Sequence, residues 1–125
     1  MHEASIASAL IGILNRQAAL HGVLSMNRVT VRVGRLRAVE PRALTACFEL
    51  MAENGPAEGA ELVIESVPAR GRCSSCGLDF EIERFRFRCT ACRGTDIVLV
   101  SGEELYIESF ETDDCGAAQA GLQEG

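Results

Sequence analysis

The sequence predicts an α+β fold: a small mixed β-sheet of about three strands with two helices, plus an inserted, cysteine-rich zinc-ribbon module. Three observations support this prediction. Apolar residues recur with a helical period before position 22 and again after position 40, whereas residues 28–36 alternate apolar and polar side chains. Four of the six cysteines form two Cys-x-x-Cys pairs between strand-like segments. At 125 residues the chain is long enough for one ordinary domain with such an appendage.

The first helix is predicted from Ile6 to the segment LHG. Apolar side chains at Ile6, Leu10, Ile13 and Leu14 would share one face of a helix. His21 falls in the last turn, where the helix dipole favours a cationic side chain. We therefore interpret His21 as a helix-end residue rather than as a metal ligand.

A second helix is predicted within the segment EPRALTACFELMAENG. Glu40 and Pro41 mark its start, and Asn54 with Gly55 marks its end. Its apolar face comprises Leu44, Cys47, Phe48 and Met51. Cys47 is accordingly expected to be a core residue.

Three segments have the pattern of strands. In RVTVRVGRL, residues 28–36, three valines alternate with arginine and threonine, so one face is expected in the core and the other lined by arginine. AELVIESV and EELYIESFE, residues 60–67 and 103–111, are the other two, and the sheet is expected to close across the cysteine-rich insert. Residues 112–125 have little to bury, which predicts a disordered tail with Cys115 as an incidental thiol.

The strongest motif is a Cys-x-x-Cys pair followed, twelve residues later, by another: Cys73, Cys76, Cys89 and Cys92. Four thiolates at this spacing are typical of a structural zinc site, which leaves no open position for chemistry. Gly77 and Gly94 are expected to permit turns that bring the backbone close to sulfur. Between the pairs, LDFEIERFRFR alternates apolar and charged residues as a β-hairpin would, through Phe80, Ile82, Phe85 and Phe87.

The cysteine module has two alternative interpretations besides a purely structural zinc site. An iron centre of the rubredoxin type uses the same ligands, but the short spacing between the pairs favours a zinc ribbon. A zinc-ribbon protein that binds nucleic acid or has a regulatory role is the main alternative, because half of the arginines fall in this region: Arg70, Arg72, Arg84, Arg86, Arg88 and Arg93. Nearby acids, the thiolate charge and a formal net charge of -6 oppose binding to nucleic acid.

The composition also predicts a compartment. The apolar stretch after MHEAS lacks the basic residues that precede the core of a signal peptide. No run approaches the eighteen or so apolar residues of a membrane span. A cytoplasmic protein without membrane association is expected, and its paired cysteines are then metal ligands rather than disulfides.

The first three residues, MHE, form a second candidate metal site. A terminal amine, the next amide nitrogen and the imidazole of His2 lie on consecutive short chelate rings and can hold a metal in one plane. Tetragonal nitrogen sites of this kind suit Ni(II) or Cu(II) and suit zinc poorly. A histidine at position 2 alone has little specificity.

The order of these parts resembles the HypA/HybF family of nickel metallochaperones for hydrogenase maturation over positions 1 to about 111. The parts are MHE, an amphipathic helix, a Val-rich strand ending GRL, a helix introduced by an acid and Pro, a strand ending VPARGRC, the cysteine spacing and a closing strand after SGEEL. The resemblance implies a transient Ni(II) cargo held by Met1, His2 and Glu3 through the terminal amine, backbone amides and the His side chain. It also implies structural Zn(II) on the four cysteines, with Glu40 as the family's acidic residue opposite the terminus. Some members have His beside the Cys pairs, where this sequence has Gly77 and Arg93.

The resemblance also implies partners and an organisation. The partners are a nickel-binding GTPase and the large subunit of nickel-iron hydrogenase, while a homodimer stays open. Residues 1–69, completed by the closing strand 102–111, are expected to be a nickel-binding domain, and residues 70–101 a zinc-binding domain. The sequence contains no Ser-His-Asp grouping and no phosphate-cradling loop, so we expect a carrier rather than an enzyme.

Overall fold

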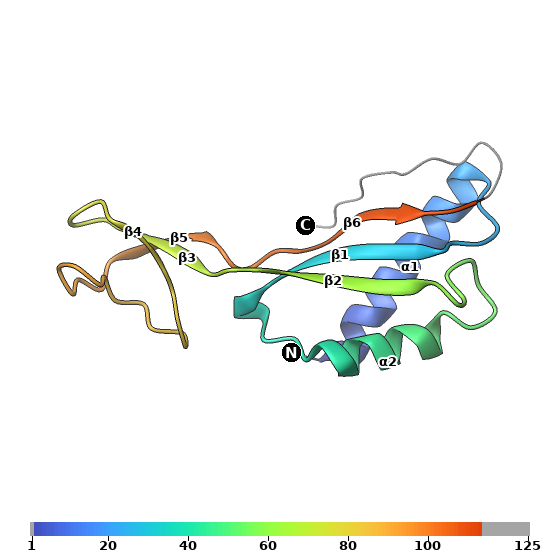
Figure 1. The fold of residues 1–125 in the computed structure, drawn as a ribbon, viewed down its shortest axis with the longest axis horizontal. Coiled ribbons are helices and arrows are strands. Elements are labelled where there is room, and N and C mark those ends of the chain that lie inside the picture. The colour runs from blue at the N-terminus through green and yellow to red at the C-terminus, as the bar shows by residue number, and fades with distance from the viewer. Residues whose placement is uncertain (1, 114–125) are drawn as a thin grey trace. The chain divides into compact units, whose positions relative to one another are not determined.

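The computed structural model describes residues 2–113 and divides them between two compact units. The helical unit, as we call it, contains residues 2–32, 39–65 and 105–113. The cysteine unit contains residues 33–38 and 66–104. The described residues form two α-helices and two sheets of three strands each (Figure 1). The predicted fold class is confirmed, whereas the functional division into a nickel and a zinc domain stays a prediction. The predicted tail from residue 114 and its Cys115 lie outside the described residues.

Helix α1, Glu3–His21, begins at Glu3 rather than at Ile6. Its buried side chains include Ile6, Leu10 and Leu14, so the predicted amphipathic face is confirmed. The helix ends at Gly22, whose φ of 68° lies in the left-handed region that glycine tolerates best. Within residues 2–113, no helix is long and apolar enough to cross a membrane.

Helix α2, Pro41–Met51, begins where the sequence predicted. The carboxylate of Glu40 accepts the N–H of Arg42 at 3.1 Å, and Pro41 occupies a first-turn position that needs no N–H. Helices α1 and α2 pack against each other.

The predicted apolar face of α2 is only partly right. Leu44 and Phe48 are fully buried, and Cys47 is half-buried rather than a core residue. Met51 was wrongly placed on this face, because its side chain is 38 % exposed. Ala52, four residues after Phe48 and 2 % exposed, takes the next buried position instead. The buried face of the helix therefore continues from Phe48 to a residue four positions later rather than three.

The larger sheet has the strand order β2-β1-β6 and carries the core of the helical unit. Its strands are β1, Arg28–Gly34; β2, Glu61–Val67; and β6, Leu105–Glu111. All three predicted strands are present, and the valines of β1 are buried as expected: Val29, Val31 and Val33. The first strand is shorter than predicted, because residues 35–37 form a 3-10 turn. Burial of both Ile107 and Phe110, three residues apart, breaks the strict alternation in β6.

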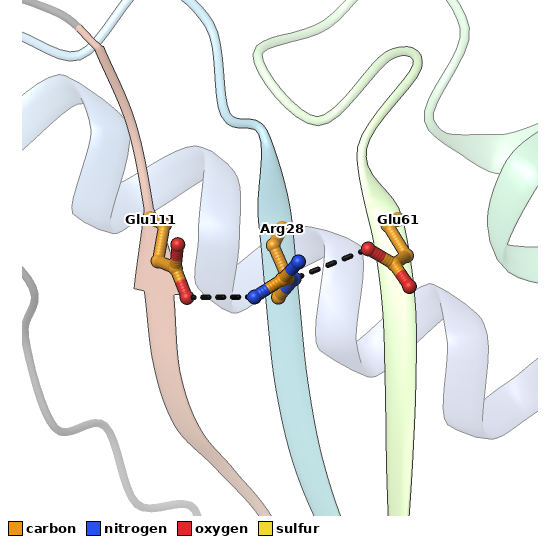
Figure 2. A network of polar contacts seen from close by, with 3 residues as sticks. All are labelled: Arg28, Glu61 and Glu111. Atoms are coloured by element: carbon orange, nitrogen blue, oxygen red, sulfur yellow. Dashed lines mark hydrogen bonds and ion pairs between the residues drawn. The ribbon is translucent and has the colours of Figure 1, made fainter.

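Ion pairs on the outer face of this sheet give the strand directions. Arg28 in β1 lies 3.1 Å from Glu61 in β2 and 3.4 Å from Glu111 in β6, as Figure 2 shows. Further along β1, the equivalent pairs are Arg32 with Glu65 and Arg32 with Glu108. Partner numbers rise along β2 and fall along β6, so β1 is parallel to β2 and antiparallel to β6. The sheet is therefore mixed, with the predicted arginine-lined outer face. Such exposed pairs stabilise the fold little.

The smaller sheet has the strand order β4-β3-β5, with both pairs antiparallel. Its strands are β3, Arg70–Cys73; β4, Asp79–Glu81; and β5, Ile97–Ser101. Two candidate metal ligands, Cys73 and Cys89, are part of its core. The other buried residues of this core are Ala69, Phe80 and Ile82. Strand β5 was not predicted from the sequence.

The hairpin predicted between the cysteine pairs is wrong in its second half. Strand β4 pairs with β3, and residues 84–88 form no strand. Phe80 and Ile82 are buried as the alternation predicted, but Phe85 and Phe87 are 57 % and 44 % exposed. Strand β4 lies at the edge of the sheet, and the second alternating segment does not pair with its free side.

Candidate metal centre

The four predicted ligands meet at one point in the cysteine unit. Their sulfur atoms lie within 4.8 Å of one another, and two of the separations, Cys73 to Cys92 and Cys76 to Cys89, are 3.5 Å. Cys73 and Cys89 are buried, whereas Cys76 and Cys92 are exposed. Each Cys-x-x-Cys pair thus supplies one buried and one exposed sulfur.

Two tight turns aim the sulfurs inward. In the first, Gly77 donates its N–H to the Cys73 carbonyl at 2.8 Å with a φ of 80°. In the second, Arg93 donates to the Cys89 carbonyl at 3.0 Å with a φ of 63°. The left-handed residue of the second turn is therefore Arg93. Gly94 allows the predicted close approach of backbone to sulfur, because an added Cβ would lie 3.3 Å from the Cys92 sulfur.

Backbone amides create an unequal charge distribution over the four sulfurs. The N–H groups of Cys92 and Ala91 donate to Cys89, and they lower the pKa of this thiol to about 6. The N–H of Cys76 likewise lowers the pKa of Cys73. Neighbouring sulfur atoms contribute to raising the pKa of the other two thiols, Cys76 and Cys92.

The N–H of Leu78 lowers the pKa of Cys76, but the Cys89 sulfur, partial desolvation and the other two sulfurs together outweigh it and raise this pKa to about 12. The N–H of Gly94 lowers the pKa of Cys92, but the Cys73 sulfur, partial desolvation and the Cys89 sulfur together outweigh it and raise this pKa. Four thiolates at these separations therefore require a cation to ionise together.

The cluster fits a tetrahedral zinc ion. Sulfurs about 2.3 Å from one ion at tetrahedral angles lie roughly 3.8 Å apart, close to the 3.5 Å found for two of the pairs. Cysteine thiolates are ligands that zinc prefers, and four of them leave no position for a reacting water. Such a site can hold the fold together and has no means of catalysis.

Lowering the pH is expected to release zinc from the zinc-loaded chain, and the release of each ion should be coupled to the uptake of at least two protons. Cys76 and Cys92 have raised pKa values and regain protons when the ion leaves. Because the pKa of Cys89 is lowered in the folded chain, ionisation of this thiol stabilises the folded state. The full stabilisation is present at pH values above the ordinary pKa of 9.0, and it is lost as the pH falls through about 6. Zinc freed at each pH would be measured with a chromogenic chelator. A one-proton dependence would contradict this description of the sulfurs.

The residues of the predicted nickel site lie at the start of the helical unit. His2 is exposed and precedes the first turn of α1, and Met1 lies outside the described residues. The carboxylate of Glu3 accepts the backbone N–H of Glu40 at 2.8 Å, which lowers the pKa of Glu3. The structure thus brings Glu3 and Glu40 together; the resemblance placed Glu40 opposite the terminus, but this hydrogen bond was not predicted. Within residues 2–113, no second group of three side chains converges as a metal site.

His21 lies at the other end of α1, roughly 28 Å along the helix axis from His2 at 1.5 Å per residue. Its Nε2 is 3.2 Å from the side-chain oxygen of Gln17, and the ring is exposed in the last turn. This position agrees with the interpretation of His21 as a helix-end residue. The two histidines lie too far apart to share a metal ion.

Comparisons with known proteins agree with this arrangement. The family model described as "Hydrogenase/urease nickel incorporation, metallochaperone, hypA" matches residues 1–112. The chain is 37% identical over 116 residues to the hydrogenase maturation factor HypA of Chlorobium luteolum, covering 93% of this chain and 99% of the relative. It is 42% identical over 113 residues to that of Desulfosudis oleivorans, covering 89% and 97%. The solution structure of the Ni metallochaperone HypA from Helicobacter pylori is similar with a TM-score of 0.65 and 25% identity, covering 89% and 97%.

Proposed function

Because the chain belongs to the HypA family of hydrogenase and urease nickel-incorporation metallochaperones, we propose that it binds Ni(II) at its N-terminus and delivers it for maturation of nickel-iron hydrogenase. The observation that carries the proposal is the extent of the family match. It spans residues 1–112 and so includes the segment Met-His-Glu as well as both cysteine pairs. We propose a carrier without enzymatic activity.

The proposed nickel ligands are the terminal amine of Met1, the amide nitrogens that follow it and the imidazole of His2. Amide nitrogens at the start of an α-helix have no intrahelical carbonyl partner, so no helical hydrogen bond has to break when they bind a metal. Among the described residues, the first such bond at this end of α1 is donated by Ile6 to the carbonyl of His2. The planar set of nitrogens suits Ni(II).

Glu3 and Glu40 have different proposed roles. Because the Glu3 carboxylate is engaged by the Glu40 amide, we assign its side chain a positioning role and its backbone nitrogen the ligand role. Glu40 caps α2 through the Arg42 amide and adds a second negative charge near the site. These contacts fix the first turn of α1 against the start of α2, and Met1 and His2 precede that anchor.

Exposure of the site supports delivery rather than storage. His2 is exposed, and its neighbour Glu3 is half-buried, so a recipient protein can approach the cargo. Release needs only that the nitrogen ligands regain protons or are exchanged for the recipient's ligands. A buried cage would first have to open.

We assign the four-cysteine cluster to structural zinc. A unit of this size has a small apolar core, here five buried residues, and modules of this kind obtain much of their folding free energy from the metal. We also assign a cytoplasmic location. The proposed partners are a nickel-binding GTPase and the large subunit of hydrogenase, and assembly as a homodimer is left open.

The experiment that tests the nickel site compares two histidine variants of the same helix. His2→Ala is expected to lose tight Ni(II) binding, because the imidazole closes the planar chelate. His21→Ala removes an equally exposed imidazole at the other end of α1 and should bind nickel as the native chain does. Calorimetric titration with Ni(II) measures both. Equal loss in the two variants, or loss in His21→Ala alone, would contradict the assigned site.

A further inference from the structure

The segment Arg84–Arg88, with the sequence RFRFR, is exposed along its whole length and belongs to no sheet. Phe85 and Phe87 are among the most exposed aromatic side chains of the described residues, at 57 % and 44 %. Neither the zinc site nor the proposed nickel site uses these side chains. We call this segment the RFRFR loop.

The shape of the RFRFR loop is defined at both ends. Before it, buried Ile82 donates its N–H to the Ala69 carbonyl at 2.7 Å. After it, buried Cys89 belongs to the four-sulfur cluster. A loop anchored in this way presents its side chains with little further ordering, which lowers the entropic cost of binding a partner.

The turn inside the loop is unusual in its residues. Arg86 donates its N–H to the Glu83 carbonyl at 3.0 Å, and both central residues have positive φ, 55° at Arg84 and 60° at Phe85. This is the pattern of a type I′ turn, which normally contains asparagine or glycine at these positions. Non-glycine residues held in the left-handed region cluster at functional sites. The turn holds an arginine and a phenylalanine outward in place of residues that would fit it without strain.

The arginines of the RFRFR loop are unusual in being both unpaired and close together in the sequence. Of the eight arginines outside the segment from 84 to 93, four form ion pairs with carboxylates, Arg28, Arg32, Arg35 and Arg72, and the four that form none are spread along the described chain: Arg16, Arg37, Arg42 and Arg70. Within residues 2–113, the loop arginines and nearby Arg93 form no such pair. Four unpaired guanidinium groups therefore gather between positions 84 and 93 in a chain whose formal net charge is -6. An anionic partner is favoured at this place and disfavoured over the rest of the chain.

A hollow of about 340 Å³ adjoins the loop. Three arginines line it, Arg86, Arg88 and Arg93, together with Glu81 and Glu83. The buried ring of Phe80 supplies an apolar contact inside it. The hollow thus combines cationic groups with an apolar surface.

We propose that the RFRFR loop and this hollow form a docking surface for an acidic segment of a partner protein, one in which carboxylates alternate with apolar side chains. Arginine forks bind carboxylates with two parallel hydrogen bonds, and the exposed phenylalanines contact the apolar side chains between them. Arginine and aromatic residues are also the side chains that dominate binding at protein interfaces. The surface is independent of the proposed nickel function, because its residues are in the cysteine unit and none is a proposed nickel ligand.

The two carboxylates in the hollow favour a protein over a polyanion. A nucleic acid or an anionic membrane presents phosphate throughout its surface, and Glu81 and Glu83 would then face like charge. Four thiolates around a zinc ion add about two further negative charges next to the hollow, since Cys89 lines it. A peptide places its carboxylates at intervals and avoids these positions.

The test uses the zinc-loaded full chain and a fluorescent peptide of alternating glutamate and leucine. We expect binding by fluorescence anisotropy that weakens about tenfold or more in Arg86→Glu and in Phe85→Ser. Arg16→Glu and Leu20→Ser are matched controls, an exposed arginine and an exposed leucine of α1, and should bind the peptide as the native chain does. Nickel binding should be unchanged in all four variants.

Three further probes decide between the occupants of this surface: single-stranded RNA, anionic lipid vesicles and the unlabelled chain itself. Tighter binding of RNA or vesicles than of the peptide, with the same dependence on Arg86 and Phe85, would overturn the proposal. Self-association lost in these variants would also overturn it. Peptide binding that falls equally in Arg86→Glu and Arg16→Glu would mean general charge attraction and would likewise contradict a defined surface.

Discussion

A chain acetylated at the Met1 amine is expected to lose tight nickel binding while it retains its fold and its zinc. Acetylation turns the terminal amine into an ordinary amide and leaves His2 at its position. The consecutive chelate rings that start at a free amine are then broken, and a tetragonal Ni(II) site has lost its first nitrogen. The sulfur cluster is formed by residues 73–92 and is unaffected.

Calorimetric titration with Ni(II) compares the native and acetylated chains, and zinc content with circular dichroism serves as the control for folding. The native chain should hold nickel at about pH 7.5 and lose it toward about pH 6, because amine and imidazole ligands must give up protons to bind. Nickel binding by the acetylated chain as tight as by the native chain would refute the N-terminal site. His21 and Cys115 would then be the ligands to test.

The double variant Cys73→Ala/Cys76→Ala is expected to lose zinc and to unfold the region from residue 70 to 101. Structural zinc supplies about 10–16 kcal/mol to small modules of this kind near neutral pH, more than a core of five buried residues replaces. The helical unit has its own fully buried side chains, which include Leu14, Phe48 and Ile107. Helices α1 and α2 should therefore persist.

Far-ultraviolet circular dichroism and amide NMR spectra of the double variant test this separation. Cys47→Ala is the matched control, because it removes a half-buried cysteine of α2 that belongs to no metal cluster among the described residues. The control should keep its zinc and both sheets. Loss of helical signal together with the zinc would contradict the independence of the two units.

Sequence patterns predicted the parts of this fold whose formation depends on local periodicity. The valines of β1 alternate strictly, and the Cys-x-x-Cys spacing brings four sulfurs to one point, so both were predictable. The strand alternation of residues 84–88 was misleading, because alternation does not determine whether a segment pairs with a free strand edge such as that of β4. No local pattern carries that information.

In the candidate sites, too, some features follow from local sequence patterns and others depend on the three-dimensional structure. The sulfur ligands follow from spacing, whereas the left-handed turn at Arg93 and the contact from Glu3 to the Glu40 amide depend on backbone geometry. The residues in contact are far apart in the sequence, and neither has a side-chain type that is specific for the contact. Such features could be found only in three dimensions.

The central claim is that one chain carries a resident zinc and a nickel cargo at separate sites. Metal content by mass spectrometry of the untagged protein, before and after loading with Ni(II), tests it most directly. The account predicts one zinc per chain as isolated and one nickel added on loading, with the zinc retained. Iron in the cysteine site, with a red colour, or nickel that enters only by displacing zinc, would contradict it.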